Sequence, residues 1–89
     1  MFYVYILYSK IFDKYYVGHT NNPEQRLISH NTSEKNTYTS KYRPWIMVKL
    51  IEVPAGRGEA MKVEKFIKKQ KSISFIKQII EHGWNDIHQ

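Results

Sequence analysis

Two residues in the first third of the sequence pair a fixed cation with an ionisable ring. Arg26 and His30 stand four residues apart, so in a helix they would lie on one face, one turn apart. Arginine binds two phosphate oxygens at once, and histidine can transfer a proton near neutral pH. The pair is therefore suited to phosphate chemistry, although a solvated helix face is the commoner setting for an isolated Arg-x-x-x-His pair.

Two tyrosines could contribute phenols to the same chemistry. Tyr5 and Tyr16 lie in two runs of β-branched and aromatic residues, 2–8 and 14–18, that predict the strands of a hairpin. If Tyr5 pairs opposite Tyr16, both phenols point to one side of the sheet with their Cβ atoms about 5 Å apart. A slip of one residue would separate them. The alternative is that both simply pack in an aromatic-rich sheet.

One carboxylate interrupts an apolar helical stripe. Ala60, Val63 and Ile67 occupy three positions of such a stripe, and Glu64 fills the remaining one. A carboxylate at the edge of a buried stripe needs a partner, which could be a metal ion or a cation. The alternative is a surface ion pair with Lys68, four residues further along.

The segment 31–43 is polar and basic, has no apolar period, and predicts a loop. Cations and rings alternate in it, as they often do where proteins contact single strands or flipped bases. A solvated surface loop is the simpler explanation. The candidate nucleic-acid contacts here are Lys35, Tyr38, Lys41, Tyr42 and Arg43.

The remaining sequence predicts the elements that must position these side chains. Asn22 and Pro23 form a cap and first position for a helix that runs to about residue 30. A third strand is expected over 45–53, a helix over 59–71, and a last helix over 72–83 that stops at Gly83. The order ββαβαα predicts an α+β fold, a small three-stranded antiparallel sheet flanked by helices. We expect one domain over 1–83 and a frayed tail over 84–89.

The composition favours a polyanionic partner. At 89 residues the chain has room for one domain, and 42% apolar residues are too many for a disordered tail. Fourteen Lys and Arg residues against eight Asp and Glu residues give a net charge of +6, which favours nucleic acid or an anionic membrane face. There is no cysteine, so disulfides and thiolate metal sites are excluded. Without a membrane-spanning stretch or a signal-peptide region, we expect a cytoplasmic protein that does not bind membranes.

The chemistry-bearing residues, taken in order, resemble a known family. The ordered set is Tyr3-Val4-Tyr5, Tyr16-Val17-Gly18, Arg26, His30 and Glu64. It is similar to the motifs of the GIY-YIG nucleases, particularly short stand-alone members of the UPF0213 type and the N-terminal domain of UvrC-like excinucleases. The resemblance extends from Tyr3 to about Lys77, and the stretch 38–45 looks like the segment that precedes the third strand in the short members.

The resemblance implies a catalytic role for Tyr5, Tyr16, Arg26 and His30, and metal binding by Glu64. Arg26 would hold the scissile phosphate, and Glu64 would bind a single Mg²⁺ or Mn²⁺ that neutralises the leaving 3′-oxygen. Tyr5 would be the general base, which requires a phenol whose pKa is lowered by nearby cations. Tyr16 would contact the phosphate or the attacking water, and His30 would assist proton transfer or orient a tyrosine.

Two positions depart from the family pattern. Tyr3 stands where the name-giving glycine of the first motif would be, and His19 follows Gly18 where many relatives have a lysine. A cation at position 19, which we also count among the nucleic-acid contacts, would therefore depend on pH. His19, His30 and Glu64 are zinc-ligand types, but their spacing matches no established zinc site.

The resulting expectation is a metal-dependent endonuclease acting on DNA, related to repair or recombination, with RNA left open as a substrate. The chain has no room for a separate domain that reads sequence, so specificity would come from DNA shape, a partner protein or a homo-oligomer. Two alternatives remain: a non-catalytic nucleic-acid-binding module with a degenerate site, and a protein-interaction domain in which the tyrosines are core.

Overall fold

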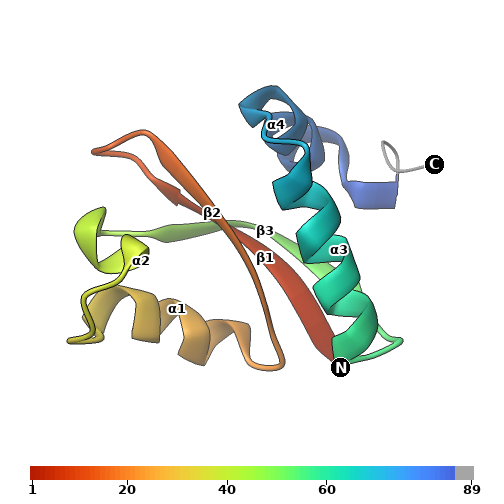
Figure 1. Ribbon diagram of the computed structural model, residues 1–89, viewed down its shortest axis with the longest axis horizontal. Coiled ribbons are helices and arrows are strands. Elements are labelled where there is room, and N and C mark those ends of the chain that lie inside the picture. The colour runs from red at the N-terminus through yellow and green to blue at the C-terminus, as the bar shows by residue number, and fades with distance from the viewer. Residues whose placement is uncertain (86–89) are drawn as a thin grey trace.

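The computed structural model describes residues 1–85 and contains three strands and four helices in that range. In chain order they are β1 (Phe2–Ser9), β2 (Lys14–Thr20), α1 (Pro23–Thr32), α2 (Tyr38–Lys41), β3 (Ile46–Val53), α3 (Arg57–Lys69) and α4 (Ile73–His82). Apart from α2, which the sequence did not predict, this is the expected order of an α+β fold (Figure 1).

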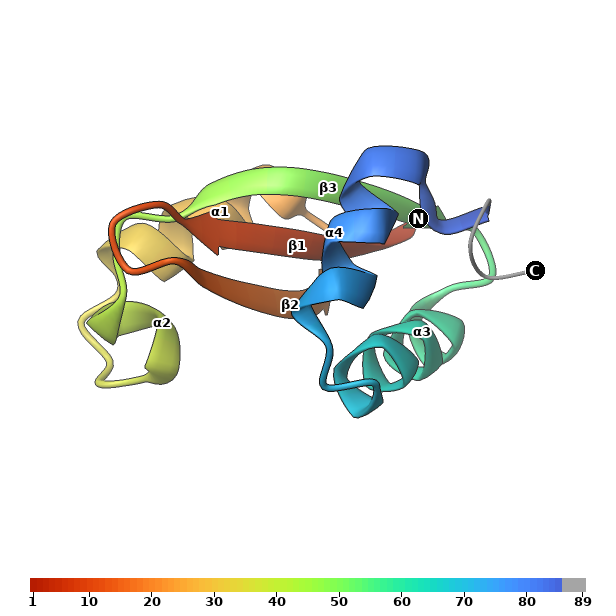
Figure 2. The same ribbon diagram turned by 90° about the horizontal axis from the view of Figure 1, so that it is seen from above.

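The sheet is antiparallel, with the strand order β2-β1-β3. Figure 2 shows α4 crossing one face of the sheet, α1 lying behind the other face, and α3 running beside β2. The central strand is therefore covered on both sides, and four consecutive residues of it, Val4 to Leu7, are at most 1% exposed. This burial explains why the first strand is an uninterrupted apolar run instead of an alternating one.

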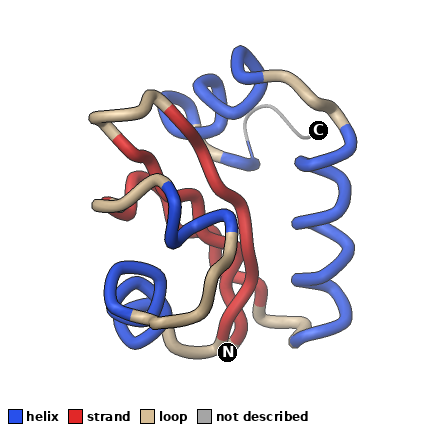
Figure 3. The backbone as a smooth tube through the Cα atoms, turned by 60° about the vertical axis from the view of Figure 1, so that its left-hand side comes forward, coloured by secondary structure: helices blue, strands red, loops and turns tan. Residues whose placement is uncertain are grey.

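The two faces of the sheet hold two separate cores. Val4 and Ile6 belong to the larger one, which α3 and α4 complete with residues such as Ile67 and Ile79. Tyr5 and Leu7 point to the other face, where they pack with Trp45 and with partly buried residues that include Tyr16 and Leu27. Figure 3 shows the sheet between these two pairs of helices. Tyr5 and Tyr16 therefore face α1 and α2.

Local sequence signals set the helix ends. Asn22 accepts a hydrogen bond from the Gln25 N–H (3.2 Å), with Pro23 at the first helical position, as expected for the start of α1. Ser72 caps α4 in the same way, and α4 ends at Gly83, whose φ of 88° favours glycine. These signals could be read from the sequence because each depends on neighbouring residues only.

Several predicted bounds need correction. The segment 31–43 is not all loop, because α1 continues through Thr32 and 38–41 form α2. The Ser40 hydroxyl accepts from the Thr37 N–H and donates to the Thr37 carbonyl, so polar contacts hold this turn where no apolar period exists. Trp84, expected in a frayed tail, is partly buried against the larger core. The rest of the predicted tail, 86–89, lies outside the described residues.

The hairpin register also differs from the expectation. Tyr5 lies opposite Gly18, and Tyr16 lies opposite Leu7. Because the offset is two residues, both phenols still point to the same face, and their ring centroids are 6.3 Å apart. The tyrosines are diagonal neighbours, and the position across from Tyr5 is left to a residue without a side chain.

Gly18 makes room for the Tyr5 ring. A Cβ at position 18 would lie 2.4 Å from the Tyr5 hydroxyl oxygen and 2.5 Å from its ring. Because Tyr5 is buried, we expect Gly18→Ala to destabilise the fold by about 1–3 kcal/mol through overpacking. Urea unfolding measures this loss.

Gly58→Ala is the matched control, since a Cβ there meets nothing within 4 Å. As a helical position in α3, it should change stability by less than about 1 kcal/mol, in the stabilising direction. Equal unfolding free energies for the two variants would show that the Tyr5 ring is not fixed over Gly18.

Candidate active site

The Tyr5 hydroxyl lies between two side chains of α1. Its oxygen is 2.7 Å from His30 Nε2, and it accepts a hydrogen bond of 3.3 Å from Arg26 Nε. Tyr5 is only 1% exposed, and burial raises its pKa to about 12 despite the opposing effect of the Arg26 hydrogen bond. The expected lowering of this pKa is therefore wrong, because desolvation of the phenol outweighs the nearby cation.

His30 is buried and has partners on both ring nitrogens. Its Nε2 faces Tyr5, and its Nδ1 is 2.9 Å from the Thr39 hydroxyl of α2. Burial, followed by the positive charges of Arg26 and Arg43, lowers the pKa of His30 to about 4. The imidazole is therefore neutral near pH 7, with one nitrogen able to accept a proton and the other able to donate one.

The lowered pKa of His30 predicts acid sensitivity. The unfolded chain protonates this histidine near pH 6.5, well before the folded protein does near pH 4. The stability contributed by neutral His30 is fully present above about pH 6.5 and is lost as the pH drops from there to the folded value, by about 2 kcal/mol between pH 7 and pH 4.5. Urea unfolding at the two pH values checks this loss, and His30→Gln should show a smaller loss. Equal losses in both proteins would contradict the assignment.

Arg26 presents its cation to the open side of the site. The residue is exposed, and within 1–85 no carboxylate forms an ion pair with it. The hydrogen bond to Tyr5 raises the pKa of Arg26 more than partial burial lowers it, and the charge of Glu64 adds to the increase. Arg26 is thus a permanent cation held by one bond, with the rest of its guanidinium able to bind an anion.

Glu64 reaches the site from α3 and contacts an imidazole and an ammonium group. One carboxylate oxygen is 2.5 Å from His19 Nδ1, and the other is 2.7 Å from Lys68 Nζ. Partial burial alone would raise the pKa of Glu64, but the hydrogen bonds from Lys68 and His19 outweigh it and lower this pKa. Glu64 is therefore ionised near neutral pH, and its charge is close enough to raise the pKa of Tyr5.

Lys68 connects α3 to the tyrosine face of the sheet. Its Nζ lies 5.2 Å from the centroid of the Tyr16 ring while it pairs with Glu64. Lys68 thus contacts both Tyr16 and the carboxylate that His19 binds. Among the described residues no group of three or more His, Cys, Asp or Glu side chains is arranged to bind a metal.

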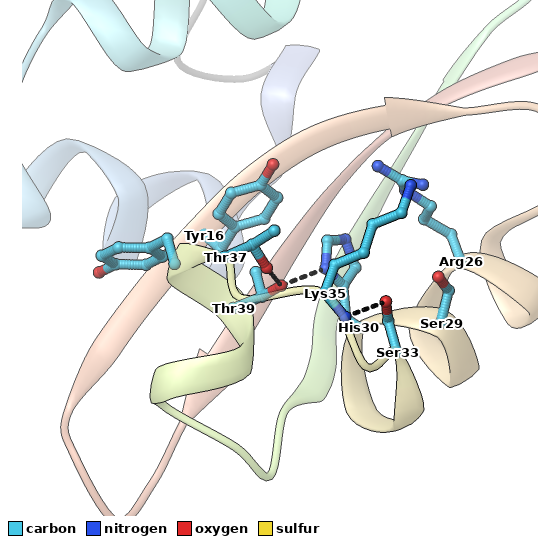
Figure 4. A pocket seen from close by; sticks show the side chains of 9 residues that line it. Tyr16, Arg26, Ser29, His30, Ser33, Lys35, Thr37 and Thr39 are labelled. Carbon is cyan, nitrogen blue, oxygen red and sulfur yellow. Dashed lines mark hydrogen bonds between the residues drawn. The ribbon is translucent and has the colours of Figure 1, made fainter.

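A cavity of about 370 Å³ opens beside Tyr16, Arg26 and His30. Figure 4 shows these side chains around it, with the hydroxyls of α1 and α2 on the walls and the Lys35 side chain extending toward Arg26. Two cations and several hydroxyl groups line the cavity beside His30, the residue that contacts Tyr5. Its lining suits a phosphate-bearing ligand.

Comparison with protein families matches residues 1–75 to the GIY-YIG catalytic domain. The chain belongs to the GIY-YIG family. This is a nuclease family, so its substrates are nucleic acids. The match covers the sheet, α1, α2 and α3, and ends within the first turn of α4.

Two curated proteins, both named UPF0213 proteins, are similar to this chain in sequence. The chain is 34% identical over 79 residues to a UPF0213 protein of Staphylococcus haemolyticus, covering 85% of this chain and 94% of that protein. It is 44% identical over 55 residues to a UPF0213 protein of Nitratidesulfovibrio vulgaris, covering 62% of this chain and 49% of that one. The chain thus matches about half the length of the latter relative. No solved structure matches the chain significantly.

In this GIY-YIG chain Tyr5 contacts three of the other residues expected to form one site, Tyr16, Arg26 and His30. The fifth, Glu64, lies within electrostatic reach of Tyr5 and Arg26. The residues expected to contact nucleic acid are more dispersed. Lys35 and Tyr38 line the cavity, whereas Lys41 is exposed on α2 and lines none of the cavities described here. His19 is engaged with Glu64.

Arg43 and Tyr42 have structural contacts that the sequence did not indicate. Arg43 donates through Nε to the His30 carbonyl (2.7 Å) and through Nη2 to the Ser33 carbonyl. Tyr42 is half-buried and packs with the smaller core around Trp45. The guanidinium therefore fixes the end of α1, and little of it is left for a ligand.

Sequence reasoning missed Thr39 and Lys68. Thr39 is 6% exposed and binds the second nitrogen of His30, but a threonine in a polar segment carries no signal of burial. Lys68 was considered only as a surface partner of Glu64, because its approach to Tyr16 depends on how α3 packs against β2.

Within the described part of the chain, no helix has both the length and the apolar character to cross a membrane.

Proposed function

We propose that the chain is a divalent-metal-dependent endonuclease that hydrolyses DNA phosphodiester bonds. The observation that carries this proposal is the Tyr5 hydroxyl held between Arg26 and His30, beside a cavity with Tyr16 on its wall and the Glu64 charge within reach. Phosphodiester hydrolysis needs an activated water, a cation for the added negative charge, and stabilisation of the leaving oxygen.

Arg26 is the proposed phosphate ligand. Its Nε already binds Tyr5, which orients the guanidinium so that its terminal nitrogens can contact two phosphate oxygens. Two observations support this role: Arg26 is exposed, and no carboxylate among the described residues forms an ion pair with it. Tyr16, whose ring lines the cavity, is the proposed phenol that contacts the phosphate or the attacking water.

Tyr5 and His30 are proposed to move the proton together. A phenol with a pKa of about 12 stays protonated near pH 7 and is a poor base alone. The 2.7 Å contact allows Tyr5 to pass its own proton to the neutral Nε2 of His30 while it takes one from water. Nδ1 of His30 then carries the hydrogen that is donated to Thr39.

Glu64 is the proposed ligand for one Mg²⁺ or Mn²⁺. It is ionised and lines a second cavity of about 580 Å³ together with His19 and Lys68. Magnesium bound through one carboxylate completes its shell with water and substrate phosphate, so this single acidic residue fits such an ion. The ion would supply Lewis-acid stabilisation of the leaving 3′-oxygen. The Lys68 ammonium must leave Glu64 for binding to occur.

A non-catalytic nucleic-acid-binding module is the second candidate. It is favoured by the contacts of His19 and Lys68 that already satisfy Glu64, and by the burial of Tyr5. In that case the protein binds DNA in EDTA, with an affinity that falls as salt is added, and never cuts it. A protein-interaction domain is less well supported, because it assigns no role to the cation-lined cavity.

The test uses purified wild-type chain with nicked, branched and single-stranded DNA in Mg²⁺ or Mn²⁺. We expect cleavage of at least one substrate, and Tyr5→Phe should reduce the rate without loss of DNA binding. If the wild-type protein binds DNA but cuts none of these substrates, the nuclease proposal is rejected in favour of the non-catalytic binding module. A role in repair or recombination, a cytoplasmic location, and specificity from a partner protein or homo-oligomer stay predictions.

A further inference from the structure

The cavity beside Arg26 is larger than one phosphate requires. It has a volume of about 370 Å³, and the residues that line it include Ser33, Lys35, Thr37 and Tyr38. Figure 4 shows the Lys35 side chain extending across it toward Arg26. Within 1–85 neither cation is paired with a carboxylate. Two unpaired cations directed to one space attract a ligand with more than one negative charge.

An aromatic ring forms one wall of this cavity. Tyr38 is 45% exposed, and its ring lies nearly parallel to that of Tyr16, with an interplanar angle of 27° and a centroid distance of 6.2 Å. The rings of Tyr42 and Trp45 also pack near the Tyr38 ring, with centroid distances of 4.9 Å and 6.2 Å. Tyr38 is therefore held by other rings while much of its surface stays open to a ligand.

The helix that carries Tyr38 is fixed to the candidate active site. The next residue, Thr39, binds His30 through its hydroxyl and accepts a 2.7 Å hydrogen bond from Trp45 Nε1 at its carbonyl. The position of the Tyr38 ring relative to Tyr5 and His30 is thus set before any ligand binds. Such preorganisation lowers the entropic cost of binding.

A third cavity lies on the other side of the two tyrosines. It has a volume of about 510 Å³, shares Tyr16 and Tyr38 with the first, and is lined by Lys14, Lys68 and Lys71. Cations thus lie on both sides of the paired rings. Basic grooves that follow a backbone, with rings on which bases stack, are typical of proteins that bind single-stranded nucleic acid.

We propose that the cavity is a subsite for one unpaired nucleotide next to the scissile phosphate, with its base stacked on Tyr38 and its phosphate on Lys35. The base must be unpaired, because a base within a duplex cannot turn its face to a ring. This inference rests on the proposed function for the position of the cut. It assigns the substrate class as DNA with an unpaired nucleotide at that position.

The test measures binding in EDTA, where no cleavage occurs. Fluorescence anisotropy gives the affinity for a labelled 12-nucleotide single strand and for the duplex of the same sequence. Tyr38→Ala should weaken single-strand binding about 5- to 100-fold, the usual loss for a base-stacking ring, and duplex binding less than twofold. Tyr38→Phe keeps the ring and should bind the single strand as wild type does.

Lys35→Ala is a surface variant that cannot disturb the core. The slope of log affinity against log salt concentration for the single strand should become smaller by about one, the value expected when one phosphate contact is lost. Lys77→Ala, an exposed lysine on α4 outside the cavities described here, is the charge-matched control and should bind both DNA forms as wild type does.

Unchanged single-strand affinity in Tyr38→Ala overturns the subsite, as does an equal loss of single-strand and duplex binding. These outcomes are separable from the nuclease proposal. If the wild-type protein cuts DNA and Tyr38→Ala binds the single strand as wild type does, the nuclease proposal stands and the subsite is rejected. If single-strand binding depends on Tyr38 but the wild-type protein never cuts DNA, the subsite stands and the nuclease proposal is rejected.

Discussion

Glu64→Gln should abolish metal-dependent cleavage while DNA binding in EDTA stays within about twofold of wild type. The amide keeps the shape of the side chain but removes the charge that a hard divalent cation requires. We expect the single-turnover rate to fall at least about 1,000-fold, which corresponds to roughly 4 kcal/mol of lost transition-state stabilisation. Gel-based cleavage of the best wild-type substrate at saturating Mg²⁺ measures the rate.

Glu59→Gln is the matched control for this change. Glu59 lies in the first turn of the same helix and is exposed, so its loss should leave the rate within twofold. Thermal unfolding of both variants separates a chemical effect from a folding effect. A Glu64→Gln variant that keeps more than a tenth of the wild-type rate would remove Glu64 as the metal ligand.

Arg26→Lys should reduce the rate nearly as strongly, by about 100- to 1,000-fold. Lysine keeps the charge but cannot donate to Tyr5 and to two phosphate oxygens with one planar group. We expect the main effect on kcat, because the added negative charge of the transition state depends most on these donors. The rates at saturating and limiting DNA give kcat and kcat/KM separately.

Arg57→Lys serves as the control for Arg26, because Arg57 starts α3, is exposed, and lines none of the cavities described here. Its rate should equal that of wild type. If Arg26→Lys raises KM alone and leaves kcat unchanged, Arg26 contributes to DNA binding and not to the chemical step.

The features predictable from sequence are those that depend on near neighbours or on a strong period. The Asn22 and Ser72 caps, the apolar run of β1 and the helical stripe around Glu64 all led to elements that the structure contains. The joint position of Arg26 and His30 on one helix face was predicted for the same reason, since a spacing of four residues fixes it.

The features that could not be predicted depend on packing between distant segments. The hairpin register turns on whether residue 18 or residue 16 lies opposite Tyr5, and the pattern of alternation allows both. The raised pKa of Tyr5 follows from burial beneath α1, and the role of Arg43 follows from where the end of α1 lies. None of these contacts is encoded in local spacing.

The metal dependence and end chemistry of DNA cleavage by the wild-type chain test the central claim most directly. Incubation of single-stranded and branched DNA with Mg²⁺ should produce fragments with 5′-phosphate and 3′-hydroxyl ends, as required when the 3′-oxygen leaves, and EDTA should stop the reaction. Cleavage that proceeds at the same rate in EDTA, or no cleavage of any DNA that the protein demonstrably binds, would contradict a metal-dependent nuclease built from Tyr5, Tyr16, Arg26, His30 and Glu64.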